Sequence, residues 1–152
     1  MKINFNLTFY SKKKKKSTLD KFSIMTFNIL CSNYASAQTY PYCPSWALNW
    51  EYRKEKILDE LFKFKTDIIC LQEVEADQFE MFFKVKLQRQ GYQGVFCPKS
   101  RARTMSDPRG VDGSAIFFRE SKFFFFQNFN FSRIKVFYFK KNFNFILILF
   151  IN

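Results

Sequence analysis

Apolar runs of different spacing alternate along the middle of this chain, and they predict alternating strands and helices. Phe22–Leu30 is almost continuously apolar apart from the interruption at Asn28, which is typical of a strand covered on both faces. Asp67–Leu71 predicts a second strand. Gln93–Cys97 and Ser114–Phe118 predict two further strands.

Two segments between these strands have helical spacing. Within Glu51–Lys65, charged residues lie opposite an apolar face made of Ile57, Leu58, Leu61 and Phe62. A second helix is predicted to open at Asp77, because Asp77 and Glu80 have the spacing of a capping box, and Gly91 is its expected stop. The polar and turn-rich segment Pro98–Gly113 predicts a surface loop.

The positive charge of the chain, +12 in all, belongs mainly to its ends. Residues 1–21 contribute +6 (seven lysines against one aspartate) and residues 123–152 contribute +4, whereas residues 22–122 contribute only +2 (fourteen basic against twelve acidic residues). We therefore predict a lysine-rich disordered tail over residues 1–21, which includes five consecutive lysines at 12–16, and a folded segment over residues 22–122.

Residues 123–152 break the pattern of the middle segment. They hold eleven of the 23 phenylalanines and lack Gly, Pro, Ala, Asp and Glu. One interpretation is an aggregation-prone, strand-rich tail. The other, which we favour, is a low-complexity tail translated from A/T-rich non-coding DNA. Its most apolar part, Phe145–Ile151, is far shorter than the ~20 residues that a membrane helix needs, so no membrane partner is expected.

The cysteines give no sign of a metal cluster. No two of them form a Cys-x-x-Cys pair, and the chain has no histidine, which disfavours a zinc site. A disulfide framework is possible, but three of the four cysteines lie in or beside apolar runs. We therefore expect reduced, buried thiols in an intracellular protein. The four positions are Cys31, Cys43, Cys70 and Cys97.

Two polar side chains mark the ends of the first two predicted strands. Asn28 interrupts the first strand, and Glu73 follows the second. If the strands are neighbours in one sheet, an amide and a carboxylate meet at one edge, where they could hold a divalent cation and a phosphate oxygen. Mg²⁺ prefers oxygen ligands and is often held by one or two carboxylates. The plainer alternatives are a satisfied strand-end amide and a solvated acid such as Glu75.

Short motifs around these two residues resemble a known superfamily. Phe27–Leu30 followed by Leu71–Val74 resembles the first two signatures of the endonuclease/exonuclease/phosphatase superfamily. Within it, the segment from residue 22 to residue 123 is similar to the carbon catabolite repressor 4 type of mRNA deadenylase. The motifs that carry this second resemblance are Tyr34–Ala35, Tyr42–Lys54, Pro98–Ala102 and Val111–Phe118.

The resemblance implies an α/β (α+β) fold, namely a β-sandwich flanked by helices and truncated in this chain. It implies Mg²⁺-dependent hydrolysis of poly(A) tails from the 3′ end with release of AMP. Glu73 would be catalytic and the magnesium ligand, and Asn28 a catalytic amide near the phosphate or the metal. Poly(A) RNA and subunits of the CCR4-NOT complex are the implied partners, in the cytoplasm or also the nucleus. The alternatives are another phosphodiesterase of the superfamily, such as a nocturnin-like enzyme, or a non-catalytic, basic RNA-binding protein.

The chain departs from the family pattern in its later part. An Asp-x-Asn pair and a terminal Asp-His of the family have no counterpart here, and no Asp follows Asp112. Because cooperating catalytic groups act as a unit, we expect little activity from these 152 residues alone.

Other residues have weaker interpretations. Lys99, Arg101 and Arg103 make a basic loop that could follow an RNA backbone. Arg53 and Lys54 are expected on a solvated helix face. Three aromatic residues could stack on bases, although packing of the helix entry onto the sheet is the favoured interpretation: Trp46, Trp50 and Tyr52.

Overall fold

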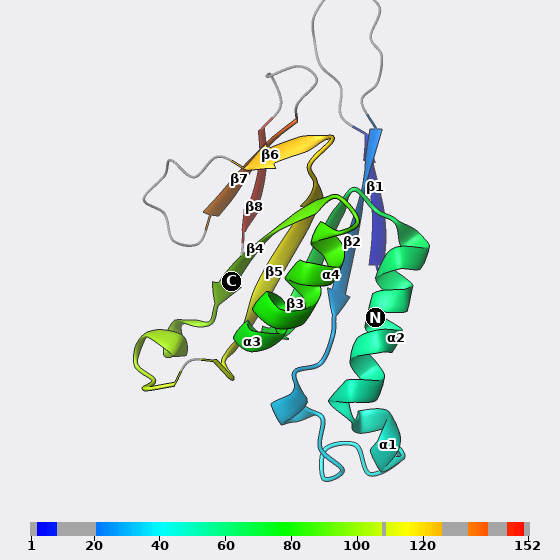
Figure 1. Ribbon diagram of the computed structural model, residues 1–152, viewed down its shortest axis with the longest axis vertical. Coiled ribbons are helices and arrows are strands. Elements are labelled where there is room, and N and C mark those ends of the chain that lie inside the picture. The colour runs from blue at the N-terminus through cyan, green and yellow to red at the C-terminus, as the bar shows by residue number, and fades with distance from the viewer. Residues whose placement is uncertain (1–2, 9–20, 108, 126–133, 140–145, 151–152) are drawn as a thin grey trace, which may run out of the picture.

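The computed structural model describes residues 3–8, 21–107, 109–125, 134–139 and 146–150. Its centre is a five-stranded sheet with the strand order β1-β2-β3-β5-β4 (Figure 1). Strand β2 pairs with β3 in parallel, and the other neighbours pair antiparallel. The strands are β1 (Ile3–Thr8), β2 (Lys21–Asn28), β3 (Ile68–Glu75), β4 (Tyr92–Pro98) and β5 (Asp112–Arg119).

Helices pack on one face of this sheet (Figure 1). The longest is α2 (Trp50–Phe64), which follows the short α1 (Ser45–Leu48). Asn49 caps α2, because its side-chain oxygen accepts a hydrogen bond from the N–H of Glu51 at 2.8 Å. A second, continuous helix consists of α3 (Ala76–Gln78), a wider π-helical turn η2 (Phe79–Phe83) and α4 (Lys84–Gln88). Two 3-10 turns, η1 (Ser32–Tyr34) and η3 (Ser100–Arg103), lie in the loops.

Apolar side chains of β3 cover both faces of the sheet. Ile68 and Ile69 are adjacent, point to opposite faces and are both fully buried. On the helical face, Ile69 packs in one core with Leu61 of α2 and Phe83 of the second helix. On the other face, Ile68 packs in a second cluster that includes Phe118. The prediction of a strand covered on both faces is confirmed for β2, whose buried residues fall in both of these clusters. The mixed α/β class with a sheet flanked by helices is confirmed as well.

The N-terminal end of the second helix differs from the prediction. The helix begins at Ala76 with Glu75 as its N-cap, two residues earlier than predicted, and Asp77 Oδ1 accepts a hydrogen bond from the N–H of the next residue, Gln78, at 2.7 Å. The predicted capping box at Asp77 is therefore wrong, because Asp77 already lies inside the helix. The predicted end of the helix at Gly91 is confirmed: α4 ends at Gln88, Gly91 takes a φ of 79°, and its N–H donates to the carbonyl of Gln88.

The two ends of the chain are more regular than their composition indicates. Residues 3–8, which were predicted to be disordered, form β1 and pair antiparallel with β2; the lysine run at 12–16 lies outside the described residues. Disorder is therefore the wrong prediction for residues 3–8, because their backbone pairs with β2 and forms the edge strand of the sheet. A three-stranded sheet follows residue 122, made of β6 (Phe123–Phe125), β7 (Ile134–Phe139) and β8 (Ile146–Phe150). The origin of residues 123–152 as translated non-coding DNA stays a hypothesis.

No helix in the part of the chain that the structure describes is long and apolar enough to cross a membrane.

Candidate functional site

Glu73 lies at an irregularity in β3. The register between β3 and β5 shifts between Gln72 and Val74, so Glu73 is the extra residue of a β-bulge. Its φ is 59°, in the left-handed region that residues other than glycine rarely adopt. A bulge re-aims a side chain, and here the half-buried carboxylate of Glu73 turns toward the segment that ends β2.

Both oxygens of the Glu73 carboxylate accept hydrogen bonds from that segment. Asn28 Nδ2 donates to Oε1 at 2.7 Å, and the backbone N–H of Cys31 donates to Oε2 at 3.1 Å. The parallel pairing that sets Asn28 opposite Gln72 brings the two strand ends together. The predicted meeting of an amide and a carboxylate at one edge of the sheet is therefore confirmed, and Glu73 is more than a solvated acid.

A second carboxylate, that of Glu75, is buried beside this edge. Glu75 Oε1 accepts hydrogen bonds from the Cys31 thiol and from the Ser32 N–H, both at 3.0 Å. Burial, together with the hydrogen bond to Glu75, raises the pKa of the Cys31 thiol to about 12. The thiol therefore stays protonated and is a poor nucleophile. The sequence predicts that Glu75 is an ordinary solvated acid. In the structure its carboxylate instead holds the loop that follows β2.

A fully buried aspartate at the start of β5 anchors the basic loop. Asp112 Oδ2 lies 2.5 Å from Lys99 Nζ, and Oδ1 pairs with the Arg101 guanidinium and accepts a hydrogen bond from the Tyr34 hydroxyl at 3.3 Å. The hydrogen bond with Asp112 raises the pKa of Lys99. The side chains of Lys99 and Arg101 remain 44% and 46% exposed, so the anchored loop still presents positive charge to solvent.

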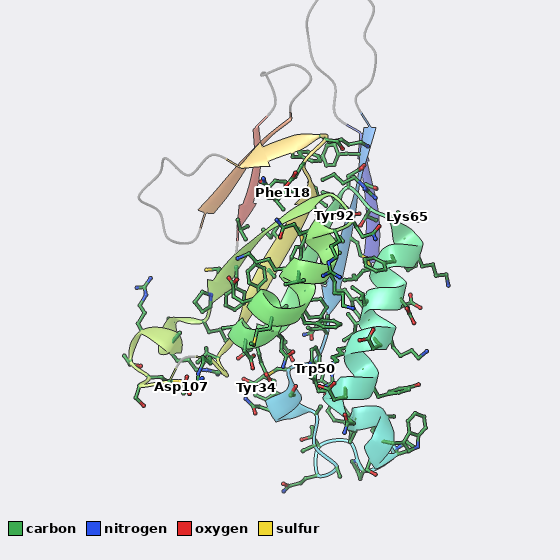
Figure 2. The ribbon with its side chains drawn as sticks, in the orientation of Figure 1. Tyr34, Trp50, Lys65, Tyr92, Asp107 and Phe118 are labelled. Carbon is green, nitrogen blue, oxygen red and sulfur yellow. The ribbon has the colours of Figure 1, made fainter. Side chains whose placement is uncertain are left out.

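This basic loop lies at the same end of the molecule as Asn28 and Glu73. Figure 2 shows Tyr34, of the η1 turn after β2, and Asp107, of the loop after η3, at the end where β2 and β3 finish. Tyr34 joins the two regions directly, because its hydroxyl accepts hydrogen bonds from Arg101 at 3.2 Å. The predicted surface loop is therefore confirmed for residues 99–107 and 109–110. The predicted bounds are too wide, because Asp112 and Gly113 are buried residues of β5.

The expected positions of four α1 and α2 residues are confirmed only in part. Trp50 does pack inward: its Nε1 donates to Gln78 Oε1 at 2.6 Å. Trp46 is 61% exposed and lies edge-on to the half-exposed Tyr52, with ring centroids 5.0 Å apart, so packing onto the sheet is wrong for both. A solvated position is wrong for Arg53, whose guanidinium donates to three backbone carbonyls.

The carboxylate oxygens of Glu73 at this edge are suitable protein ligands for a Mg²⁺ ion. Each oxygen of Glu73 receives one hydrogen bond and keeps further capacity to accept, and the hydrogen bonds leave the carboxylate half-buried rather than enclosed. Among the described residues, no group of three or more His, Cys, Asp or Glu side chains could hold a metal ion. A cation held here would therefore rely on one carboxylate together with water and phosphate oxygens, as Mg²⁺ often does.

Comparison with known proteins assigns the fold to a family. The model of the endonuclease/exonuclease/phosphatase family matches residues 25–141. The chain belongs to this family. Its members that act as nucleases are generally metal-dependent. The solved structure of ANGEL2, described as a 2′,3′-cyclic phosphatase, superposes with a TM-score of 0.64 at 27% identity, over 76% of this chain and 36% of that chain.

The curated relatives are more similar in sequence. The chain is 56% identical over 104 residues to the CCR4-NOT transcription complex subunit 6-like-A of Xenopus laevis, which covers 67% of this chain and 19% of that protein. It is 52% identical over 109 residues to the CCR4-Not complex 3′-5′-exoribonuclease subunit Ccr4 of Mycosarcoma maydis, covering 70% and 16%. The chain therefore spans less than a fifth of the length of these relatives.

Sequence reasoning missed two residues of the site, for different reasons. Arg53 could have been found, because it precedes Ile57 by four residues and Leu61 by eight and so shares their buried helix face. Asp112 carried no such signal, since a charged residue before a strand usually lies in solvent. Only the pairing of β5 between β3 and β4 shows that its side chain is enclosed.

Proposed function

We propose that this chain carries the N-terminal part of the catalytic domain of a Mg²⁺-dependent, poly(A)-specific 3′-5′ exoribonuclease, which shortens mRNA poly(A) tails and releases AMP. The observation that carries the proposal is the bulged Glu73 carboxylate, held by Asn28 and Cys31 at the edge of the sheet. Similarity to a fungal protein named as a 3′-5′-exoribonuclease supports this reaction.

In this proposal Glu73 is the magnesium ligand and Asn28 the amide beside it. Bound Mg²⁺ would polarise the scissile phosphate and lower the pKa of the attacking water. The Asn28 amide and the Cys31 N–H hold the Glu73 carboxylate in one orientation before any cation arrives. A ligand that is already oriented loses little conformational freedom on binding.

The basic loop supplies a surface for the RNA backbone. Lys99 and Arg101 keep nearly half of their side chains exposed, and both lie around Tyr34. Their contacts with Asp112 restrict their rotamers, so they present positive charge at a defined place near the end of β2. Contacts of this kind position a nucleic acid without reading its sequence.

The chain alone should have little activity. No histidine is present among its 152 residues, and the later Asp-x-Asn motif of the resembled deadenylases has no counterpart. The test therefore supplies the remaining part from a relative. Residues 22–122 would replace the matching segment of the Mycosarcoma maydis protein, and the purified chimera would be incubated with Mg²⁺ and 5′-labelled poly(A).

We expect the chimera to shorten poly(A), and Glu73→Ala in it to lower the rate by about 10²-fold or more, the scale of losing a catalytic group. The matched control is Glu55→Ala, which removes an exposed glutamate of α2. Equal rates for the unsubstituted and Glu73→Ala chimeras would refute the role of Glu73. Chain 1–152 by itself serves as the low-activity reference.

Another phosphodiesterase of the family, such as a nocturnin-like enzyme, is the enzymatic alternative. The higher identity to the two CCR4-NOT relatives, 56% and 52%, than to ANGEL2, 27%, favours the deadenylase. The products formed by the same chimera would test this alternative, because a phosphatase releases inorganic phosphate whereas a deadenylase releases successive AMP.

The partners and the location belong to the same proposal. The names of the two relatives place those proteins in the CCR4-NOT complex. We infer that a full-length protein carrying this segment would bind poly(A) RNA and join such a complex, in the cytoplasm or also in the nucleus. Co-purification with CCR4-NOT subunits and imaging of a tagged protein would test both statements.

A further inference from the structure

A single guanidinium holds the backbone that ends β2. Arg53 Nη1 donates to the carbonyl oxygens of Ile29 at 3.0 Å and Leu30 at 2.8 Å, and Nε donates to the carbonyl oxygen of Leu48 at 2.9 Å. The indole ring of Trp50 lies over the guanidinium, 5.3 Å from its carbon to the ring centroid. One side chain of α2 therefore ties the end of β2 to the junction between α1 and α2.

The carbonyls of Ile29 and Leu30, which directly follow β2, belong to consecutive peptide planes whose N–H groups face Asn28 and Glu73. A trans peptide is planar, and its oxygen and hydrogen point to opposite sides. The plane of the Ile29 carbonyl carries the Leu30 N–H, which donates to Asn28 Oδ1 at 2.9 Å. The plane of the Leu30 carbonyl carries the Cys31 N–H, which donates to Glu73 Oε2. Fixing the two oxygens therefore fixes the direction of both N–H groups.

The residue between these planes is strained. Leu30 has a φ of 59°, a left-handed conformation that persists in a residue with a Cβ only where its surroundings hold it. If the plane between Leu30 and Cys31 turned over, it would point a carbonyl oxygen at the Glu73 carboxylate. The hydrogen bond from Arg53 to the Leu30 carbonyl opposes that rotation.

We propose that Arg53 is the positioning residue of the Glu73 site: by holding the carbonyls of Ile29 and Leu30, it aims the Asn28 amide and the Cys31 N–H at the Glu73 carboxylate. Through that orientation it sets the affinity of the site for a divalent cation, a step that rests on the proposed role of Glu73. Arg53 itself touches neither cation nor substrate. Lysine cannot replace it, because one ammonium group on a flexible stem does not reproduce the rigid fork of donors.

The test compares Arg53→Lys, Arg53→Gln and the matched control Arg89→Lys, an exposed arginine after α4, in chain 1–152. Nitrogen-15 NMR without metal would follow the Cys31 N–H and the Asn28 side-chain amide, and Glu73→Gln would identify the effect of the carboxylate on both signals. Titration with Mn²⁺ alone would then give the affinity of the site through paramagnetic broadening of the same signals.

We expect both Arg53 variants to move the Cys31 and Asn28 signals toward their positions in Glu73→Gln and to weaken Mn²⁺ binding about tenfold or more, the usual effect of losing a residue that orients a ligand. Arg89→Lys should change neither. Folded Arg53 variants with unchanged Cys31 and Asn28 signals would overturn the proposal.

Two further outcomes remain decisive. If the unsubstituted chain binds no Mn²⁺, the metal role of Glu73 fails, while the metal-free signals still decide the role of Arg53. If the Arg53 variants do not fold, hydrogen exchange of the unsubstituted chain decides instead. We expect protected N–H groups at Leu30 and Cys31, and exchange of both at the rate of an unfolded peptide would refute the arrangement.

Discussion

Among single residues, Asp112 is a buried carboxylate whose charge is balanced by partly exposed cations. Asp112 is fully buried, but its two cationic partners, Lys99 and Arg101, are nearly half exposed. Removing the acid leaves two cations that water can solvate. Removing the cations leaves a buried charge without compensation, which is the more costly change.

We therefore predict an asymmetry. The double variant Lys99→Met and Arg101→Met should lower the urea midpoint of unfolding more than Asp112→Asn does, and adding Asp112→Asn to the double variant should recover part of the loss. Urea denaturation followed by Trp fluorescence would measure all three. A double variant as stable as Asp112→Asn would show that the buried carboxylate does not depend on these cations.

The thiols of the buried Cys31 and the half-buried Cys70 make the stability of the fold depend on pH. Burial raises the pKa of Cys70 from its ordinary 9.0 to about 11, and burial with the Glu75 hydrogen bond raises that of Cys31 to about 12. Above pH 9 the unfolded chain loses these protons and the folded chain keeps them. Their contribution is therefore complete below pH 9 and is lost as the pH rises through 11 to 12.

We expect the free energy of unfolding to fall as the pH rises from 9 to about 12. It should fall less steeply for Cys70→Ala, when each protein is compared with its own value at pH 8. Iodoacetamide at pH 8 should label Cys31 and Cys70 slowly. Rapid alkylation of Cys70 in the folded protein, seen by mass spectrometry, would contradict its burial.

At the scale of elements, the close approach of β4 and β5 places Asp112 next to the basic loop. Gly113 follows Asp112 and pairs with Pro98. A Cβ at position 113 would lie 2.7 Å from Pro98 Cα and against the carbonyl oxygen of Cys97, so backbone would have to move. The strand pair that encloses Asp112 thus depends on the missing side chain of this glycine.

Gly113→Ala should therefore destabilise the protein by about 1–3 kcal/mol through overpacking. The control is Gly110→Ala, where a Cβ meets no atom within 4 Å, and where a surface change of about 0.5 kcal/mol or less is expected. Urea denaturation would measure both. Equal midpoints for the two variants would show that β4 can shift without loss.

In the molecule as a whole, the two ends carry most of the net charge and residues 22–122 carry only +2. Residues 1–21 and 123–152 together contribute +10 of the +12 (+6 and +4). Binding to RNA through such charge releases counterions and weakens as salt rises. The non-catalytic alternative attributes all RNA binding to these ends, whereas the proposed site adds Lys99 and Arg101.

Replacing the five lysines at 12–16 by serine keeps β1 and removes five charges. We predict that the slope of log affinity for poly(A) against log salt becomes shallower by up to about 3.5, or about 0.7 for each lysine in contact with phosphate. The remaining affinity should fall further with Lys99→Met and Arg101→Met. Filter binding at several salt concentrations would measure this, and complete loss with the serine variant alone would favour the non-catalytic alternative.

The sequence predicted much of the architecture because periodicity reports burial directly. The strand over Phe22–Leu30, the helix over Glu51–Lys65 and the stop at Gly91 follow from local patterns that tertiary contacts reinforce. Both ends were harder, because β1 pairs with β2 across the lysine run and no local pattern records a partner so far along the chain. The proximity of Asn28 and Glu73 was predictable, since parallel neighbouring strands end at the same edge.

Local patterns in the sequence thus predict strands β2 to β5, their helical cover and the two polar side chains that end neighbouring strands. The direction in which those side chains point depends on contacts between elements that are distant in the chain. The left-handed backbone at Leu30 and Glu73 involves no glycine, and neither conformation is favoured locally. Each exists because contacts from distant elements, the bulge against β5 and the guanidinium of Arg53, outweigh the local preference of the chain.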